Sequence, residues 1–335
     1  MMFLHRLIGP VVFFVCISWV CGDSAPYLRV VDDESGGRVL QIASRTLVSP
    51  KKNGPLVTLL GVSHLGEASY YGKIQKILDS ADLVLFEGVG FEDKVQKKQT
   101  GKINAVSEMQ LSLARSMGLV FQLEAIRYDR AHFRNSDISL ESLKTRLEGG
   151  TLNSSKKGPR SGKTGIKGKK EGGTKQSKKL MEALSGNSFV LSFLGKALNF
   201  LGKDPKFRAI MKLAIVETLG AIEGDITRLA ESSGPGMEKF MRVLLEDRNT
   251  IVFRDLRKVL KDKNPPKSIV IFYGAAHMTG LENRLVDKLG FQPKEDDWLV
   301  AFGVNPPKAG LSDFQVGLVR KMIRMQIQKI TQRAK

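Results

Sequence analysis

The sequence predicts a mixed α/β fold whose central sheet is built from two units of strand, G-x-x-H, helix and strand, with a helical region inserted between them. Continuous apolar runs at residues 56–60 and 268–273 each lead into a glycine that is followed three positions later by a histidine. Residues 180–260 show only helical periodicity. With 335 residues and 42% hydrophobic content, the chain can bury the core of one large domain with an insertion.

Residues 1–22 are predicted to form a signal peptide. Their apolar run, residues 7–20, has the length of a signal-peptide core and is short for a membrane span, which needs about 20 residues. We therefore expect an exported protein that is periplasmic, bound to the cell envelope or secreted. Two alternatives stay open, an uncleaved membrane anchor and a lipoprotein acylated at Cys21.

Because both cysteines, Cys16 and Cys21, lie in this segment, cysteine nucleophiles and cysteine-ligated zinc sites are excluded from the mature domain.

The first α/β half is predicted to span residues 23–148. It begins with a short edge hairpin at residues 27–48, because apolar and polar residues alternate around a Ser-Gly-Gly turn. The apolar run at 56–60 is rich in β-forming residues and predicts a buried strand. A helix, a second buried strand and two further helices follow, at about residues 65–78, 83–86, 105–117 and 139–147.

Residues 149–179 are predicted to form a disordered basic linker. The chain has a net charge of +19, and residues 156–179 contain ten Lys or Arg against one acidic residue, Glu171. This stretch has almost no apolar residue that could pack. The uneven charge argues against specific nucleic-acid binding by the folded domain, although the linker itself is suited to contact an anionic polymer.

The remaining chain is divided into three predicted parts. Residues 180–262 form the helical region, and residues 263–310 form the second α/β half, with a strand at 268–273, a helix at 281–289 and a strand at 298–302. Residues 311–335 form a basic amphipathic helix.

The chemistry is predicted at the carboxyl ends of the strands. His64 and His277 follow Gly61 and Gly274, and Glu87 directly follows the strand at 83–86. In open α/β sheets the ligand crevice lies at this edge, so we expect the three side chains to converge. Two imidazoles and a carboxylate are three of the four ligands of a catalytic divalent metal site, with Mn, Co or Zn as candidate ions. Without a metal, a histidine beside a carboxylate could serve as a general base.

The segments 61–64, 83–88, 246–249 and 274–280 resemble the successive motifs of the TraB/GumN/PrgY superfamily, which includes the Tiki proteases and is related to erythromycin-esterase and ChaN-like proteins. The resemblance implies a mixed α/β domain with a central polar site. The Tiki branch implies a metal-dependent peptidase, and the TraB and PrgY branch implies binding or inactivation of small signalling peptides. His64, Glu87 and His277 then become the metal or catalytic group. Arg248 becomes a motif arginine that could hold a substrate carboxylate or an oxyanion, with a surface ion pair to Glu246 as the alternative.

Other residues are assigned to ligand or cofactor contact near this site. Gly61 and Gly274 allow the backbone to approach a ligand closely. Tyr273 is expected either to reach the pocket with its hydroxyl or to lie in the core. Asp137 belongs to the same site or caps the helix near residue 139. His132 is either a site residue or a surface loop residue.

The sequence thus predicts an exported, metal-dependent hydrolase that acts on peptide or amide bonds of a peptide or small-molecule substrate. The alternative is a module that binds or sequesters a signalling peptide or a haem-like cofactor through the same residues.

Overall fold

The computed structural model describes residues 26–89, 105–147, 198, 200–221 and 241–333. The predicted signal peptide, the predicted basic linker and parts of the predicted helical region lie outside these residues. Among the residues described, no helix has the length and apolar character needed to cross a membrane.

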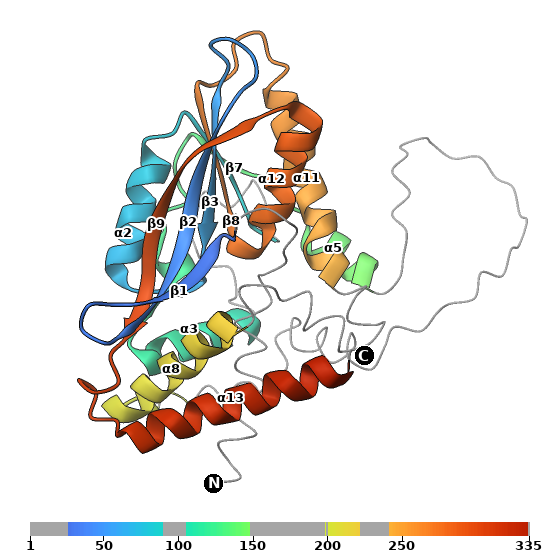
Figure 1. Ribbon diagram of the computed structural model, residues 1–335. Coiled ribbons are helices and arrows are strands. Elements are labelled where there is room, and N and C mark those ends of the chain that lie inside the picture. Colours follow the sequence, from blue (N-terminus) through green and yellow to red (C-terminus); the bar gives the residue numbers. More distant parts are fainter. Residues whose placement is uncertain (1–25, 90–104, 148–197, 199, 222–240, 334–335) are drawn as a thin grey trace, which may run out of the picture.

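The predicted fold class is confirmed, because helices pack around a central mixed sheet of seven strands (Figure 1). The strand order is β1-β2-β3-β8-β5-β7, and β9 pairs with β2. The strands β3, β8, β5 and β7 are parallel, whereas β1, β2 and β9 are antiparallel to their neighbours. The strands are β1 (Leu28–Asp32), β2 (Arg38–Val48), β3 (Leu56–Val62), β5 (Leu83–Phe86), β7 (Phe133–Asn135), β8 (Ser268–Gly274) and β9 (Gln292–Val304).

The parallel strands β3, β8 and β5 form the centre of the core. Apolar side chains point to both faces of these strands, and most are fully buried, as expected for parallel strands covered on two sides. The helix α2 (Ala68–Asp79) covers one face, and α12 (Ala275–Leu289) with α11 (Glu246–Val259) covers the other (Figure 1).

The strand β8 lies between β3 and β5, although it is far from both in sequence. Gly61 pairs with Tyr273 and Val62 with Gly274, so the two G-x-x-H segments leave the sheet side by side. Phe86, the last residue of β5, pairs with Phe272 on the other side of β8. The carboxyl ends of all three strands therefore share one edge.

A second layer of helices lies beyond the sheet (Figure 1). It contains α3 (Ala105–Met117), α8 (Pro205–Ala221) and α13 (Asp313–Arg333). The helices α8 and α13 pack through a small apolar cluster that includes Leu213, Val319 and Ile323. The predicted helices at 105–117 and 139–147 are present as α3 and as α5 (Leu140–Leu147), and the predicted C-terminal helix is present as α13.

Three expectations about individual elements are corrected. The hairpin is at an edge only through β1, which among the described strands pairs with β2 alone, whereas β2 is internal and pairs with β9 on one side and with β1 and β3 on the other. The helix after β8 begins at Ala275 rather than at 281, so His277 belongs to its first turn. The strand β9 begins at Gln292 rather than at 298 and pairs with β2, so the second unit does not return its last strand beside β8.

Four short elements have no counterpart in the sequence prediction, because two to four residues are too few for a periodic pattern. They are β4 (Leu65–Gly66), β6 (Val120–Phe121), α4 (Gln122–Ala125) and β7.

A buried ion cluster lies where β2 meets β9 and α12. Arg45 of β2 binds Glu282 of α12 at 2.6 Å and Asp296 of β9 at 2.6 and 2.7 Å. The side chains of Arg45 and Glu282 are 4% and 6% exposed. Removing one partner of such a cluster leaves a buried charge uncompensated.

We therefore expect Arg45→Ala to lower the free energy of unfolding by about 3 kcal/mol, as measured by urea denaturation. The matched control is Arg29→Ala. Arg29 is exposed, donates to Gln41 and lies 4.0 Å from the centre of the Trp298 ring, and such exposed contacts contribute below about 1 kcal/mol. Equal losses in the two variants would contradict a stabilising role for the buried cluster.

Candidate functional site

We call the carboxyl ends of β3, β8 and β5, with the polar side chains that follow them, the polar edge. Glu87 lies at its centre, directly after β5. Its Oε1 accepts a hydrogen bond from Arg248 Nη2 at 2.5 Å, and its Oε2 accepts one from the backbone N–H of Gly274 at 2.6 Å. Gly274 is the N-cap residue of α12. The carboxylate therefore faces the positive end of a helix dipole as well as a guanidinium.

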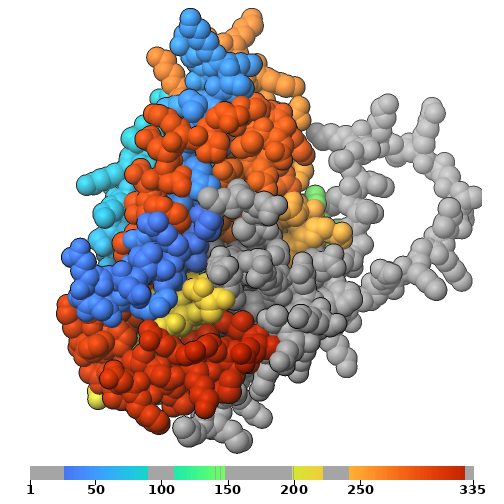
Figure 2. Space-filling model, in the orientation of Figure 1, coloured from blue at the N-terminus to red at the C-terminus, as the bar shows by residue number. Residues whose placement is uncertain are grey.

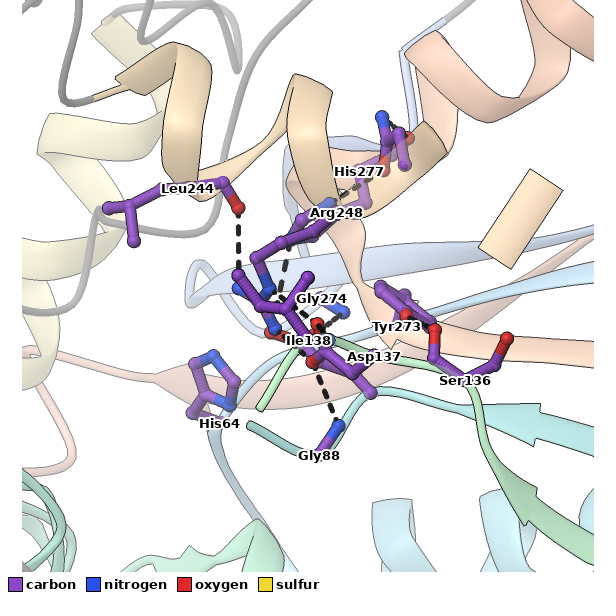
Figure 3. A network of polar contacts seen from close by, with 12 residues as sticks. His64, Gly88, Ser136, Asp137, Ile138, Leu244, Arg248, Tyr273, Gly274 and His277 are labelled. Carbon is purple, nitrogen blue, oxygen red and sulfur yellow. Dashed lines mark hydrogen bonds and ion pairs between the residues drawn. The ribbon is translucent and has the colours of Figure 1, made fainter. Parts of the chain in front are cut away.

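Arg248 is held in place by a second carboxylate (Figure 3). Its Nε and Nη2 donate to the two oxygens of Asp137 at 3.0 and 2.6 Å, and its Nη1 donates to the carbonyl of Leu244 at 3.3 Å. With the bond to Glu87, four of its five N–H groups are engaged. Asp137, whose side chain is fully buried, also accepts from the backbone N–H groups of Gly88 and Ile138.

These contacts keep Glu87 ionised. Burial alone would raise its pKa, but the charge of Arg248, the two nearby histidines and the Gly274 N–H together hold the pKa of Glu87 well below its usual range. The burial cost for Arg248 is likewise outweighed by Glu87 and Asp137, which raise its pKa well above the usual value. The site therefore contains two carboxylates and one guanidinium.

His277 stands in the first turn of α12 and is 1% exposed. Its Nδ1 lies 2.7 Å from Asn249 Oδ1, while Asn249 Nδ2 donates to the carbonyl of His277 at 3.2 Å. Because the amide nitrogen is engaged there, the amide oxygen faces the imidazole and Nδ1 carries the proton. Nε2 thus carries the lone pair, and it lies 3.8 Å from Glu87 Oε1. Burial, partly offset by Glu87, lowers the pKa of His277 to about 4.

His64 lies apart from His277 in the view of Figure 3, and an amide holds it in the same way. It is half-buried, and its Nδ1 lies 2.8 Å from Gln122 Oε1. Gln122 Nε2 donates to the hydroxyl of Tyr128 at 2.9 Å, which directs the amide oxygen toward the imidazole. The Nε2 atom of His64 has no hydrogen-bond partner among the described residues. Both histidines therefore present an Nε2 lone pair.

The structure brings together most of the residues that the sequence assigns to the site. Arg248 and Gly274 bind Glu87, His277 lies beside it, Asp137 binds Arg248, and His64 is near enough to influence the charge of Glu87. The alternative for Arg248, a surface pair with Glu246, does not occur, since Glu246 binds Arg284 at 2.5 Å.

Some assigned residues have structural positions instead. Tyr273 is fully buried and donates its hydroxyl to the carbonyl of Ser136 at 2.5 Å, so it belongs to the core beside the site. At Gly61, a Cβ atom would approach Ile42 at 3.0 Å and Ala275 at 3.2 Å, so this glycine permits close packing of β3. His132 donates from Nε2 to the carbonyl of Leu78 at 3.0 Å. The helix α5 is capped by Ser139, whose Oγ accepts from the N–H of Ser142 at 3.1 Å, and not by Asp137.

Sequence reasoning missed the two amides that orient the histidines. Asn249 adjoins Arg248 in the segment 246–249, and its place on the inner face of an amphipathic helix could have drawn attention to it. Gln122 follows a two-residue strand, and no pattern in the sequence marks it.

The donor types at this edge are those of divalent metal sites, because two imidazoles and an ionised carboxylate are present and amide oxygens hold the Nδ1 atom of each ring. Within the described ranges, however, no group of three or more His, Cys, Asp or Glu is placed so as to hold such an ion. Both oxygens of Glu87 are engaged by Arg248 and Gly274. The metal stays a prediction.

Comparison of the chain with protein-family models, with curated proteins and with solved structures found no match in any of the three.

The buried imidazole predicts a pH dependence of stability. The pKa of His277 is about 4 in the folded protein, against an ordinary value of 6.5. At a pH between these two values, the imidazole binds a proton in the unfolded chain but not in the folded chain. The free energy of unfolding should therefore fall as the pH is lowered from about 6.5 to about 4, by roughly 2–3 kcal/mol from this group.

His277→Gln removes this titration and should show a shallower loss of stability over the same pH range. The measurement is urea unfolding at a series of pH values with a chelator present, so that bound metal does not contribute. Parallel curves for the variant and the wild type would contradict a buried neutral His277.

Proposed function

We propose that the chain is an exported, TraB/GumN-like hydrolase that cleaves peptide or amide bonds at the polar edge of β3, β8 and β5. One observation carries the proposal. His64 and His277 are each held at Nδ1 by a side-chain amide oxygen, His277 Nε2 lies 3.8 Å from Glu87 Oε1, and both imidazoles are near enough to lower the pKa of Glu87. Two oriented lone pairs next to a fixed negative charge are suited to accept a proton from water.

In this proposal His64 is the general base. It is the more accessible of the two histidines, and Gln122 keeps its Nδ1 protonated and its Nε2 free. Nε2 takes a proton from a water molecule that attacks the carbonyl carbon, and it returns the proton to the leaving amine. Glu87 stabilises the imidazolium that forms between these steps, and the Nε2 of His277 orients the water by accepting its second hydrogen bond.

Arg248 acts as a positioning residue. Four of its five N–H groups are occupied by Asp137, Glu87 and Leu244, so we do not assign it the binding of a substrate carboxylate, the role that the resemblance implies. It fixes Glu87 and keeps that carboxylate ionised. The negative charge of Glu87 then favours the protonated form of both imidazoles.

The predicted divalent metal ion would be held by His64, Glu87 and His277. When bound, such an ion would polarise the substrate carbonyl and lower the pKa of a bound water.

The central experiment is a screen of purified protein with short peptide, amide and ester substrates. We expect His64→Ala and His277→Ala each to reduce turnover by about 100-fold or more, the size expected for loss of a general base or a water-orienting group. His132→Ala is the matched control, because this histidine contacts the carbonyl of Leu78 away from the site and its loss should leave turnover unchanged.

Binding of a peptide or haem-like ligand without turnover would favour the alternative function, sequestration through the same residues. Equal activity in the two site variants and the wild type would contradict the site itself. Elemental analysis, together with activity measured after chelation and after addition of Mn, Co or Zn, tests the metal part of the prediction.

Arg248→Lys tests the positioning role. A lysine cannot replace the planar fork that binds both oxygens of Asp137 and one of Glu87, so we expect kcat to fall by about 100-fold with little change in KM. Arg45→Lys is the matched control, because Arg45 also makes a buried two-point contact with a carboxylate, outside the site. Both variants should lose stability, but the control should keep its kcat. Equal kcat values in the two variants would make Arg248 a purely structural residue.

A further inference from the structure

The layer formed by α8 and α13 exposes two aromatic rings. Phe314, in the first turn of α13, is 76% exposed, and Phe200, just before α8, is 71% exposed. No other large hydrophobic side chain among the described residues exceeds 39% exposure. Single exposed hydrophobic residues are common on protein surfaces, so the arrangement around these rings decides whether they have a function.

The outer face of α13 presents a row of exposed apolar and basic side chains. Phe314, Lys321 and Met325 are separated by seven and four residues, so they lie within about 40° of one another around the helix axis. All three are exposed, as is Arg324 beside them. Val319 and Ile323, on the opposite face, are buried against α8. We call Phe314, Lys321, Arg324 and Met325 the basal stripe, and Figure 2 shows that α13 lies along the lower part of the molecule in this view.

The layer around the basal stripe is strongly basic. Residues 200–221 and 305–328 contain eight Lys or Arg against three acidic residues, Asp204, Glu217 and Asp313. Glu217 is bound by Arg320 at 2.7 Å, and Asp204 accepts the N–H of Lys206 at the start of α8. Among the described residues, no carboxylate forms an ion pair with Lys321 or Arg324. The stripe therefore offers free cations between two apolar tips.

We propose that the basal stripe binds the surface of an anionic membrane. A lipid surface can receive both kinds of side chain at once, because the Phe314 ring and the Met325 thioether enter the headgroup region while Lys321 and Arg324 pair with acidic headgroups. A purely anionic polymer would satisfy the cations but would leave the two apolar tips in water. The basal stripe shares no residue with the polar edge of the sheet, so this membrane proposal does not depend on the proposed hydrolysis.

Co-sedimentation of the full chain with phosphatidylcholine vesicles, with and without phosphatidylserine, tests the proposal. The wild type should bind only the vesicles that contain phosphatidylserine, and added salt should weaken binding. The double variant Lys321→Glu, Arg324→Glu and the double variant Phe314→Ser, Met325→Ser should each lower the partition coefficient at least about 10-fold.

The matched control is Arg257→Glu, Lys261→Glu, which makes the same charge change at exposed positions at the end of α11. It should bind vesicles like the wild type, and unchanged thermal unfolding of all three variants verifies that they fold. Loss of binding in the charge variant alone would assign the stripe to a polyanion and overturn the membrane proposal. Unchanged binding in both stripe variants, an equal loss in the control, or no binding of the wild type would also overturn it.

Discussion

The guanidinium of Arg248 links parts of the chain that are distant in sequence. Asp137 and Glu87 precede it by 111 and 161 positions. Through Glu87 the same network reaches the first residues of α12, where Gly274 donates to the carboxylate. A buried cation with two buried carboxylates is tolerated only when nearly every donor and acceptor is satisfied. The ends of β5, β7 and β8 are therefore fixed relative to α11, and His277, in the first turn of α12, takes its position from that arrangement.

Much of this arrangement could be predicted from the sequence, because its determinants are local. The buried strands are continuous apolar runs, and the residues that follow them fall at the carboxyl edge of any parallel sheet. The positions of His64, Glu87 and His277 follow from that rule. Arg248 could not be placed by periodicity, since a charged residue on an amphipathic helix usually faces solvent, and only its resemblance to a family motif marked it.

The rest depends on contacts that no local pattern encodes. Several strand orders would bury the same apolar residues. The sequence does not show that β8 lies between β3 and β5 or that β9 pairs with β2. Gln122 and Asn249 matter only because a histidine from another segment lies beside them. Arg45 sits in an alternating strand that gives no sign of a buried charge, and its role appears only when α12 and β9 supply Glu282 and Asp296.

The place of β8 in the sheet also constrains how the chain can fold. The strands β3 and β5 do not pair with each other, and both pair with β8, whose first residue is Ser268. Contacts of such long sequence separation form slowly. While the ribosome is still making the first 267 residues, the parallel core has no central strand and its two flanking strands have open edges. The chain therefore acquires its native sheet only late in synthesis, which is compatible with transport of an unfolded chain and exposes that chain to edge-to-edge aggregation until β8 arrives.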